Sequence, residues 1–319
     1  MFARPLPGTT KVAALLLIIV MVPSSIITAF VGQSAGMAFG LAFGVAMSVA
    51  STASNVVTIG YGALAAALAA ASATAGNDAG AVALLMLASS AIMAIANRRS
   101  AGIMSLAPIL VVLFGPGPID LPWAGAASWV LVGIAGGLLT TRVLKFEANP
   151  RPVAATIALH HAVVVGVLAA GSMYWALAEA VPHGYWVAVT VVVALRPLPA
   201  ERADTLKGRL LGTLLGAAVA LVAAITLPTW AAAAVAAICL YLLVVYAMGG
   251  SYFMQTLFLT PMLLLLASLG DDSLSIELTA QRVLFTIVGA GLVVLGAVIL
   301  RWWDGRSVVP DELGESAPI

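Results

Sequence analysis

Charged residues are scarce in this sequence. Only 8% of the 319 residues are Asp, Glu, Lys or Arg, whereas 62% are hydrophobic, and the mean hydropathy is +1.12. A soluble domain carries about 25% charged residues, so a chain of this size cannot cover its surface in water with so few. The composition excludes a soluble globular protein, a disordered chain and a nucleic-acid-binding protein, and it indicates a polytopic membrane protein.

Cysteine and the motifs of enzymatic catalysis are also nearly absent. The single cysteine, Cys239, allows no intrachain disulfide and makes no metal site by itself. The sequence has no HExxH, GxSxG or GxxxxGK[ST] motif. We therefore expect no enzymatic activity, no metal and no cofactor. No Asp or Glu lies in the middle of an apolar run, so the usual carboxylate proton carrier of a transporter is missing.

The apolar residues stand in continuous runs such as LLLIIVMV. A transmembrane strand would alternate in polarity over about 10 residues, whereas a helix needs about 20 apolar residues to cross the bilayer. The sequence therefore predicts an all-α polytopic membrane protein. We expect twelve spans, at about residues 12–31, 35–53, 56–75, 80–97, 100–115, 124–145, 153–178, 184–198, 207–227, 230–248, 251–269 and 280–302.

Lys and Arg positions predict the orientation of these spans, because basic residues concentrate in cytoplasmic loops. With the N-terminus in the cytoplasm, all but one of the 14 basic residues fall on the cytoplasmic side, and Arg282 is the exception. The opposite loops carry acidic residues such as Asp78 and Glu179. We expect a multi-pass protein of the inner (plasma) membrane with both termini in the cytoplasm.

The sequence also repeats itself. Pro108 and Pro261 lie in similar apolar runs, and the stretch that begins at Trp129 matches the stretch that begins at Arg282 at the same offset. We expect two halves of six helices each, residues 1–148 and 149–319. Because six is even, both halves enter from the same side, as parallel repeats related by an axis along the membrane normal.

Several short motifs in the second half resemble the fusaric acid resistance protein family of integral membrane exporters, which includes the aromatic acid efflux pumps. The similarity covers about residues 155–300, whereas the first half is similar in topology alone. The core from Arg209 to Gly216 is also similar to that of plant aluminium-activated malate transporters, which conduct organic anions. The motifs are Tyr185-Trp186, Thr190, Arg196-Pro197, the run RLLGTLLG that begins at Arg209, Ser251-Tyr252, Thr260-Pro261, and Arg282 with Gly289.

The resemblance implies an exporter of aromatic or other hydrophobic organic acids. Two alternatives stay open, a passive organic-anion channel and a non-transporting membrane assembly protein. The expected partners are a small organic acid and the lipid bilayer, with a homodimer as a further option. Larger family members carry a cytoplasmic region between their two halves, where this chain has only the short segment from Lys145 to Pro152.

Two arginines are the leading candidates for substrate binding. Arg209 opens its span from the cytoplasmic side, and Arg282 lies at or just inside the outer end of the last span. A guanidinium can donate two parallel hydrogen bonds to a carboxylate, so we expect one arginine at each mouth of a path. Arg209 could instead be a topology anchor, and Arg282 could pair with Glu277, Asp271 or Asp272.

Hydroxyl and aromatic side chains complete the expected substrate site. Thr213 and Thr190 offer hydroxyl groups, and Tyr185 and Tyr252 could stack on an aromatic substrate.

His160 and His161 are candidates for a proton relay, because histidine titrates near neutral pH. Adjacent residues point about 100° apart on a helix, so both cannot face one pore equally, and a buried hydrogen-bonded histidine is the alternative. Gly212 and Gly216 form a small-xxx-small face, which predicts close helix packing.

Overall fold

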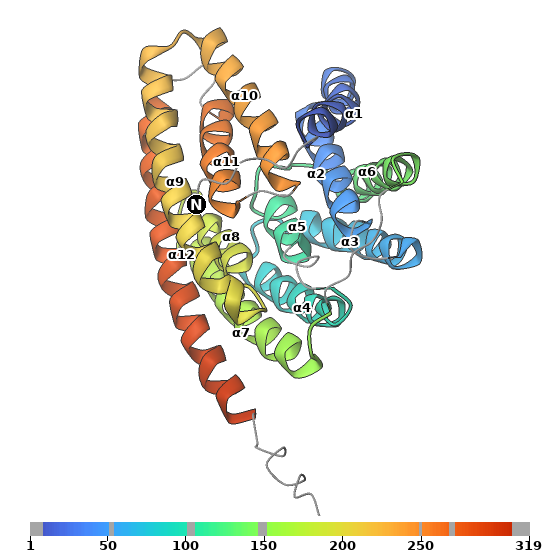
Figure 1. Ribbon diagram of the computed structural model, residues 1–319, viewed down its shortest axis with the longest axis vertical. Coiled ribbons are helices and arrows are strands. Elements are labelled where there is room, and N and C mark those ends of the chain that lie inside the picture. Colours follow the sequence, from blue (N-terminus) through green and yellow to red (C-terminus); the bar gives the residue numbers. More distant parts are fainter. Residues whose placement is uncertain are drawn as a thin grey trace, which may run out of the picture.

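The computed structural model describes residues 9–50, 54–100, 106–145, 152–248, 251–267 and 272–307, and all regular structure within these ranges is α-helical. The predicted all-α fold is therefore confirmed for the described part of the chain (Figure 1). The helices are α1 (Thr9–Phe30), α2 (Gln33–Ala50), α3 (Asn55–Ala75), α4 (Ala79–Asn97), α5 (Leu106–Phe114), α6 (Trp123–Val143), α7 (Ala155–Ala178), α8 (Tyr185–Ala194), α9 (Pro199–Thr226), α10 (Thr229–Ala247), α11 (Tyr252–Ala267) and α12 (Asp272–Ser307).

The prediction of twelve full spans is only partly confirmed. Within the described ranges, eight helices are long and apolar enough to cross a membrane: α1, α3, α4, α6, α7, α9, α10 and α12. The shortest of the others are α5, with 9 residues, and α8, with 10, about half of what a bilayer requires. Helix α8 ends at Ala194 because Pro197 disfavours helical backbone just before it.

The chain packs as two neighbouring groups of helices, with α1–α6 on the right of Figure 1 and α7–α12 on the left. In the first group α2 packs on α6, α3 on α5 and α6, and α4 on α5. In the second group α8 packs on α12, α9 on α11 and α12, and α10 on α11. The groups meet where α4 packs along α7, α1 along α10 and α5 against α8.

Glycines bring α9 and α11 into backbone contact. A Cβ atom added at Gly212 would lie 2.8 Å from Thr256 Cβ and 2.9 Å from the carbonyl oxygen of Phe253. A Cβ atom at Gly216 would lie 2.7 Å from the carbonyl oxygen of Leu257. Side chains any larger than hydrogen would separate the two helices, so the small-xxx-small spacing sets their distance.

Replacing Gly212 with Ala should lower the free energy of unfolding by about 1–2 kcal/mol, because overpacking forces the α9 and α11 backbones apart. Gly291→Ala in α12 is the matched control, since a Cβ atom there meets nothing within 4 Å and alanine favours helix. Thermal unfolding of the detergent-solubilised protein measures both variants. Equal stability of the two variants would contradict the close α9–α11 contact.

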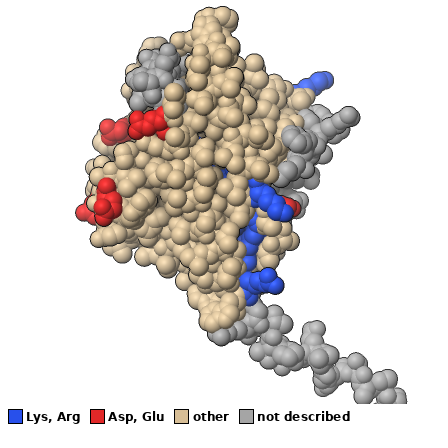
Figure 2. Space-filling view, turned by 90° about the vertical axis from the view of Figure 1, so that its left-hand side faces the viewer, with Lys and Arg blue, Asp and Glu red and all other residues tan. Residues whose placement is uncertain are grey.

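Charges of opposite sign lie on different sides of the molecule. Figure 2 shows Lys and Arg side chains along one side of the face in view and most Asp and Glu side chains on the opposite side. Arg98 follows α4 and Arg301 lies near the end of α12, whereas Asp78 precedes α4 and Glu277 lies near the start of α12. All four side chains are exposed, and the tan surface between the two charged sides of this face carries uncharged residues.

Candidate functional site

Two arginine side chains are buried in the second group of helices. Arg209 of α9 and Arg282 of α12 are each only 2% exposed, and they are among the largest fully buried side chains of the described residues. The guanidinium carbon of Arg282 lies 3.5 Å from the ring centroid of Trp186, which is the second residue of α8. This is a cation–π contact that covers one face of the guanidinium and leaves its N–H edge available.

Most N–H groups of the two arginines lack hydrogen-bond partners. This holds for Nε, Nη1 and Nη2 of Arg282, and for Nε and Nη2 of Arg209. The groups that interact electrostatically with Arg282 are Arg209, Tyr185 and Tyr252, and none of them is a carboxylate. Like charges therefore face each other in the interior, and within the described residues no counter-charge acts on Arg282.

The expected pairing of Arg282 with Glu277 is wrong. Nε2 of Gln281 donates a hydrogen bond to Oε1 of Glu277 over 2.9 Å, and Nδ1 of His183 bonds to Oε1 of Gln281, also over 2.9 Å. Glu277 is exposed, whereas Arg282 points inward from the same helix. Asp271 and the side chain of Asp272 lie outside the described residues.

The structure brings the two arginines together, whereas the sequence predicts them at opposite ends of a path. Helix α9 begins at Pro199 and α12 at Asp272, several residues before the apolar spans expected at about 207 and 280. At a rise of 1.5 Å per residue, each arginine lies about 15 Å along its helix. The charged segments predicted to be loops are helical, and they shift both arginines into the interior.

Two further predicted residues present unpaired hydroxyl groups. The hydroxyls of Thr213 and Tyr252 are buried and have no hydrogen-bond partner. Thr213 follows Arg209 by one helical turn and therefore lies on the same face of α9. Tyr252 packs on α9 at Gly208, the residue before Arg209, because a Cβ atom added at Gly208 would lie 3.1 Å from the Cδ1 atom of Tyr252. Both hydroxyls thus belong to the surroundings of Arg209.

Thr190 and Tyr185 occupy different positions. The Thr190 hydroxyl donates a hydrogen bond to the carbonyl of Trp186 over 2.9 Å. The Cβ atom of Thr190 packs against Gly289, since a Cβ atom added at Gly289 would lie 2.6 Å from it. Thr190 is therefore engaged in the contact between α8 and α12. The Tyr185 ring lies 5.1 Å from the Trp186 ring and lines a cavity.

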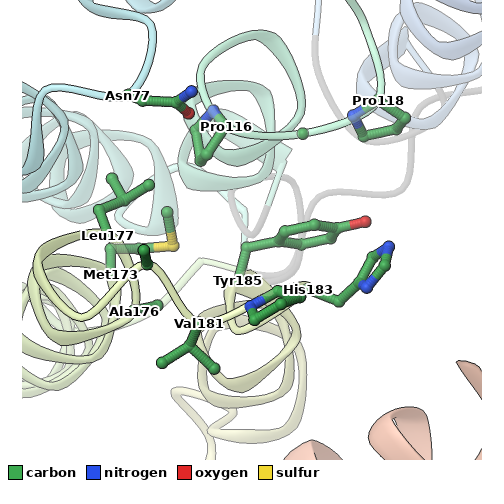
Figure 3. A pocket seen from close by; sticks show the side chains of 12 residues that line it. Asn77, Pro116, Pro118, Met173, Ala176, Leu177, Val181, His183 and Tyr185 are labelled. Atoms are coloured by element: carbon green, nitrogen blue, oxygen red, sulfur yellow. The ribbon is translucent and has the colours of Figure 1, made fainter. Parts of the chain in front are cut away.

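This cavity has a volume of about 490 Å³ and lies where the two helix groups meet. Figure 3 shows the Tyr185 ring reaching across it, between the segment that carries Pro116 and Pro118 and the side chain of His183. The lining residues are Asn77, Pro116, Gly117, Pro118, Met173, Ala176, Leu177, Ala180, Val181, Pro182, His183 and Tyr185. Tyr185 thus connects the cavity, through Trp186, to the guanidinium of Arg282.

The two predicted proton-relay histidines lie elsewhere. Nε2 of His161 bonds to the carbonyl oxygen of Leu195 over 2.6 Å, at the turn between α8 and α9. The ring of His160 lies 5.2 Å from the ring of Trp303 in α12. The two rings face different neighbours, as adjacent positions on a helix require, and neither is among the electrostatic partners of Arg282.

Sequence reasoning misses Trp186 as a site residue. An aromatic residue at the start of an apolar run is typical of the membrane interface, so the sequence predicts an interfacial tryptophan there. The contact with Arg282 depends on α8 packing against α12. The only sequence signal is the place of Trp186 in the motif Tyr185-Trp186.

Comparison with known families agrees with the resemblance seen in the sequence. Residues 168–296 match the model of a family described as fusaric acid resistance protein-like. This stretch is similar to the fusaric acid resistance protein-like domain. It includes Arg209, Arg282, Trp186 and Tyr252, and with eight candidate spans the chain is a multi-pass membrane protein. A search of curated proteins and a search of solved structures found no match.

Proposed function

We propose that this protein transports organic anions across the membrane and that Arg209 and Arg282 form its anion-binding site. The observation that carries the proposal is the burial of both guanidinium groups with five of their nitrogens lacking hydrogen-bond partners. A buried charge is costly unless it is paired. A site that keeps two such charges inside a membrane protein is complementary to a negatively charged ligand, and the fusaric acid resistance protein-like domain is consistent with transport.

Aromatic or other hydrophobic organic acids fit this site best. Trp186 covers a face of the Arg282 guanidinium, so a carboxylate would approach in the plane of the N–H groups and accept two hydrogen bonds. The Tyr252 and Thr213 hydroxyls offer further donors. The rings of Tyr185, Trp186 and Tyr252 supply apolar surface against which an aromatic substrate can stack.

The proposed path runs from the turn between α8 and α9 to the cavity at Tyr185. The guanidinium carbon of Arg196 lies 5.7 Å from the centroid of the Tyr252 ring, so a third cation lies next to Tyr252. We assign the Arg196 end to the cytoplasm and the cavity to the outside. The exposed Arg98 and Arg301, opposite the exposed Asp78 and Glu277, support this orientation. A negative membrane potential then favours export of an anion.

The expected duplication into two six-helix halves is part of this proposal. The packing of α2 on α6, of α3 on α5 and α6, and of α4 on α5 recurs six helices later, as α8 on α12, α9 on α11 and α12, and α10 on α11. Two contacts between the halves, α1 with α10 and α7 with α4, are also related to each other by the shift of six helices. This recurrence supports a pseudo-two-fold relation between the halves, with the arginine pair in the second half.

Flux of an aromatic carboxylate panel into proteoliposomes, with and without a pH gradient, tests the proposal. We expect saturable flux of at least one aromatic acid. A rate that rises with the pH gradient would identify proton coupling, whereas a rate that follows voltage alone would identify a uniporter or an organic-anion channel. Absence of flux for every aromatic acid and dicarboxylic acid would refute the proposed transport and favour the assembly protein.

A further inference from the structure

The arginine pair has a property that anion transport alone does not require: its charge is uncompensated when the site is empty. Five guanidinium nitrogens of Arg209 and Arg282 are buried without partners, and the two cations interact repulsively. We propose that the site holds a small inorganic anion of the chloride type whenever it holds no organic acid, and that the protein is therefore an obligate anion exchanger. This inference rests on the proposed function and adds a second substrate class to it.

The energetic argument concerns the empty site. Removing the partner of a buried charge shifts a folding equilibrium on the order of 10²- to 10³-fold, and here two like charges share one enclosure. An empty site closed to water on both sides would suffer this penalty, whereas a site that holds an anion would not. Any carrier passes through a closed form between its inward- and outward-facing forms. In this protein, the closed form is thus restricted to the state in which the site holds an anion.

The donors around the site suit a small spherical anion as well as a carboxylate. Three groups near the site have N–H or O–H donors without partners. The Arg209 guanidinium and the Tyr252 hydroxyl belong to residues that interact with Arg282, and the Thr213 hydroxyl lies one helical turn from Arg209. They come from α9 and α11, and the Arg209 guanidinium and Tyr252 lie close enough to Arg282 on α12 to interact with it electrostatically. Chloride accepts hydrogen bonds from several directions, so it can occupy such a shell after a larger acid has left.

The consequence for transport is a requirement for an anion on both sides of the membrane. An anion carried one way is released, the empty site cannot close, and the cycle continues only when another anion binds from the same side. Net transport without a counter-anion is blocked, while one-for-one exchange is fast.

Chloride self-exchange tests this directly and needs no organic substrate. Proteoliposomes are loaded with chloride or with dextran sulfate, a polyanion too large to enter the site, and uptake of ³⁶Cl⁻ is followed with the membrane potential clamped. We expect uptake at least about 10-fold faster into chloride-loaded vesicles. Equal uptake into both, or no uptake into either, would overturn the proposal.

A charge-reduced variant makes the test sharper. Arg209→Gln halves the uncompensated charge, so its empty site should close, and uptake into dextran sulfate vesicles should rise to within about 3-fold of that into chloride vesicles. Lys207→Gln, an exposed position on the same helix, should keep the wild-type requirement for internal chloride. A retained requirement in Arg209→Gln would contradict the proposed cause.

Thermal unfolding keeps the proposal testable if Arg209→Gln is not stable enough for reconstitution. Chloride should raise the melting temperature of the wild-type protein and should raise that of Lys207→Gln equally. No chloride effect on the wild type would refute occupancy of the site by an inorganic anion. Chloride exchange without any organic acid flux would refute the proposed organic substrate but not the exchange mechanism. Organic acid flux into dextran sulfate vesicles at the full rate would refute the exchange mechanism but not the organic substrate.

Discussion

Arg282→Gln should weaken organic-anion transport by about 10- to 100-fold, because each hydrogen bond to a charged group contributes about 1.5–3 kcal/mol. The same substitution should stabilise the protein by about 1–3 kcal/mol in anion-free buffer, since it removes a buried charge that has no counter-charge among the described residues. A stabilising substitution that abolishes activity is typical of a residue retained for function. Proteoliposome flux and thermal unfolding in detergent measure the two effects.

Arg301→Gln is the matched control for this prediction. Arg301 lies on the same helix, near its end, and its side chain is exposed, so both flux and stability should stay close to wild type. Wild-type flux in Arg282→Gln would refute the proposed role of Arg282. A loss of stability would contradict the prediction that the buried charge of Arg282 destabilises the protein.

The contact between Trp186 and Arg282 should contribute about 2 kcal/mol to stability, as estimated for a cation–π pair shielded from water. A double-mutant cycle isolates this term. Trp186→Leu should cost about 2 kcal/mol more in the wild type than in the Arg282→Gln background, because the second background lacks the cation. Chemical or thermal unfolding of the four proteins gives the coupling energy directly.

Trp230→Leu provides the comparison for that cycle. Trp230 lies in the first turn of α10 and is 76% exposed, so its substitution should show no coupling to Arg282→Gln. A coupling energy near zero for Trp186 as well would mean that the tryptophan does not stabilise the buried guanidinium. The Trp186→Leu protein should also transport aromatic acids less well, because water then reaches the exposed face of Arg282.

The sequence predicts the all-α membrane fold and the family of the second half, but not the depth of the arginines. Apolar runs locate a helix only where it meets lipid or protein core, so hydropathy ends α9 and α12 where their charged turns begin. The segments that start at Pro199 and Asp272 are helical nonetheless. That difference is why Arg209 and Arg282 are predicted at two mouths of a path, when they meet in the interior.

The residues of the candidate site also divide into those that the sequence predicts and those that it misses. Arg209, Arg282 and Thr213 are predicted because guanidinium and hydroxyl groups suit a carboxylate, and Tyr252 because its ring suits stacking on an aromatic substrate. Trp186 is missed because its partner is almost one hundred positions away in the sequence, and no local pattern relates α8 to α12. Thr190 shows the converse, since a hydroxyl group that the sequence offers to a substrate is already bound to the backbone of its own helix.

The glycine contacts of α9 with α11 and of α12 with α8 place the two arginines of the proposed anion site on two different helix pairs. Gly212 and Gly216 hold one helix pair together backbone to backbone, and Gly289 holds the other against Thr190. Arg209 therefore belongs to one pair and Arg282 to the other. In the proposed exchange, charge repulsion in the empty site would push the two pairs apart, and an anion between the arginines would draw them together. Occupancy of the site would then itself be the signal for closure.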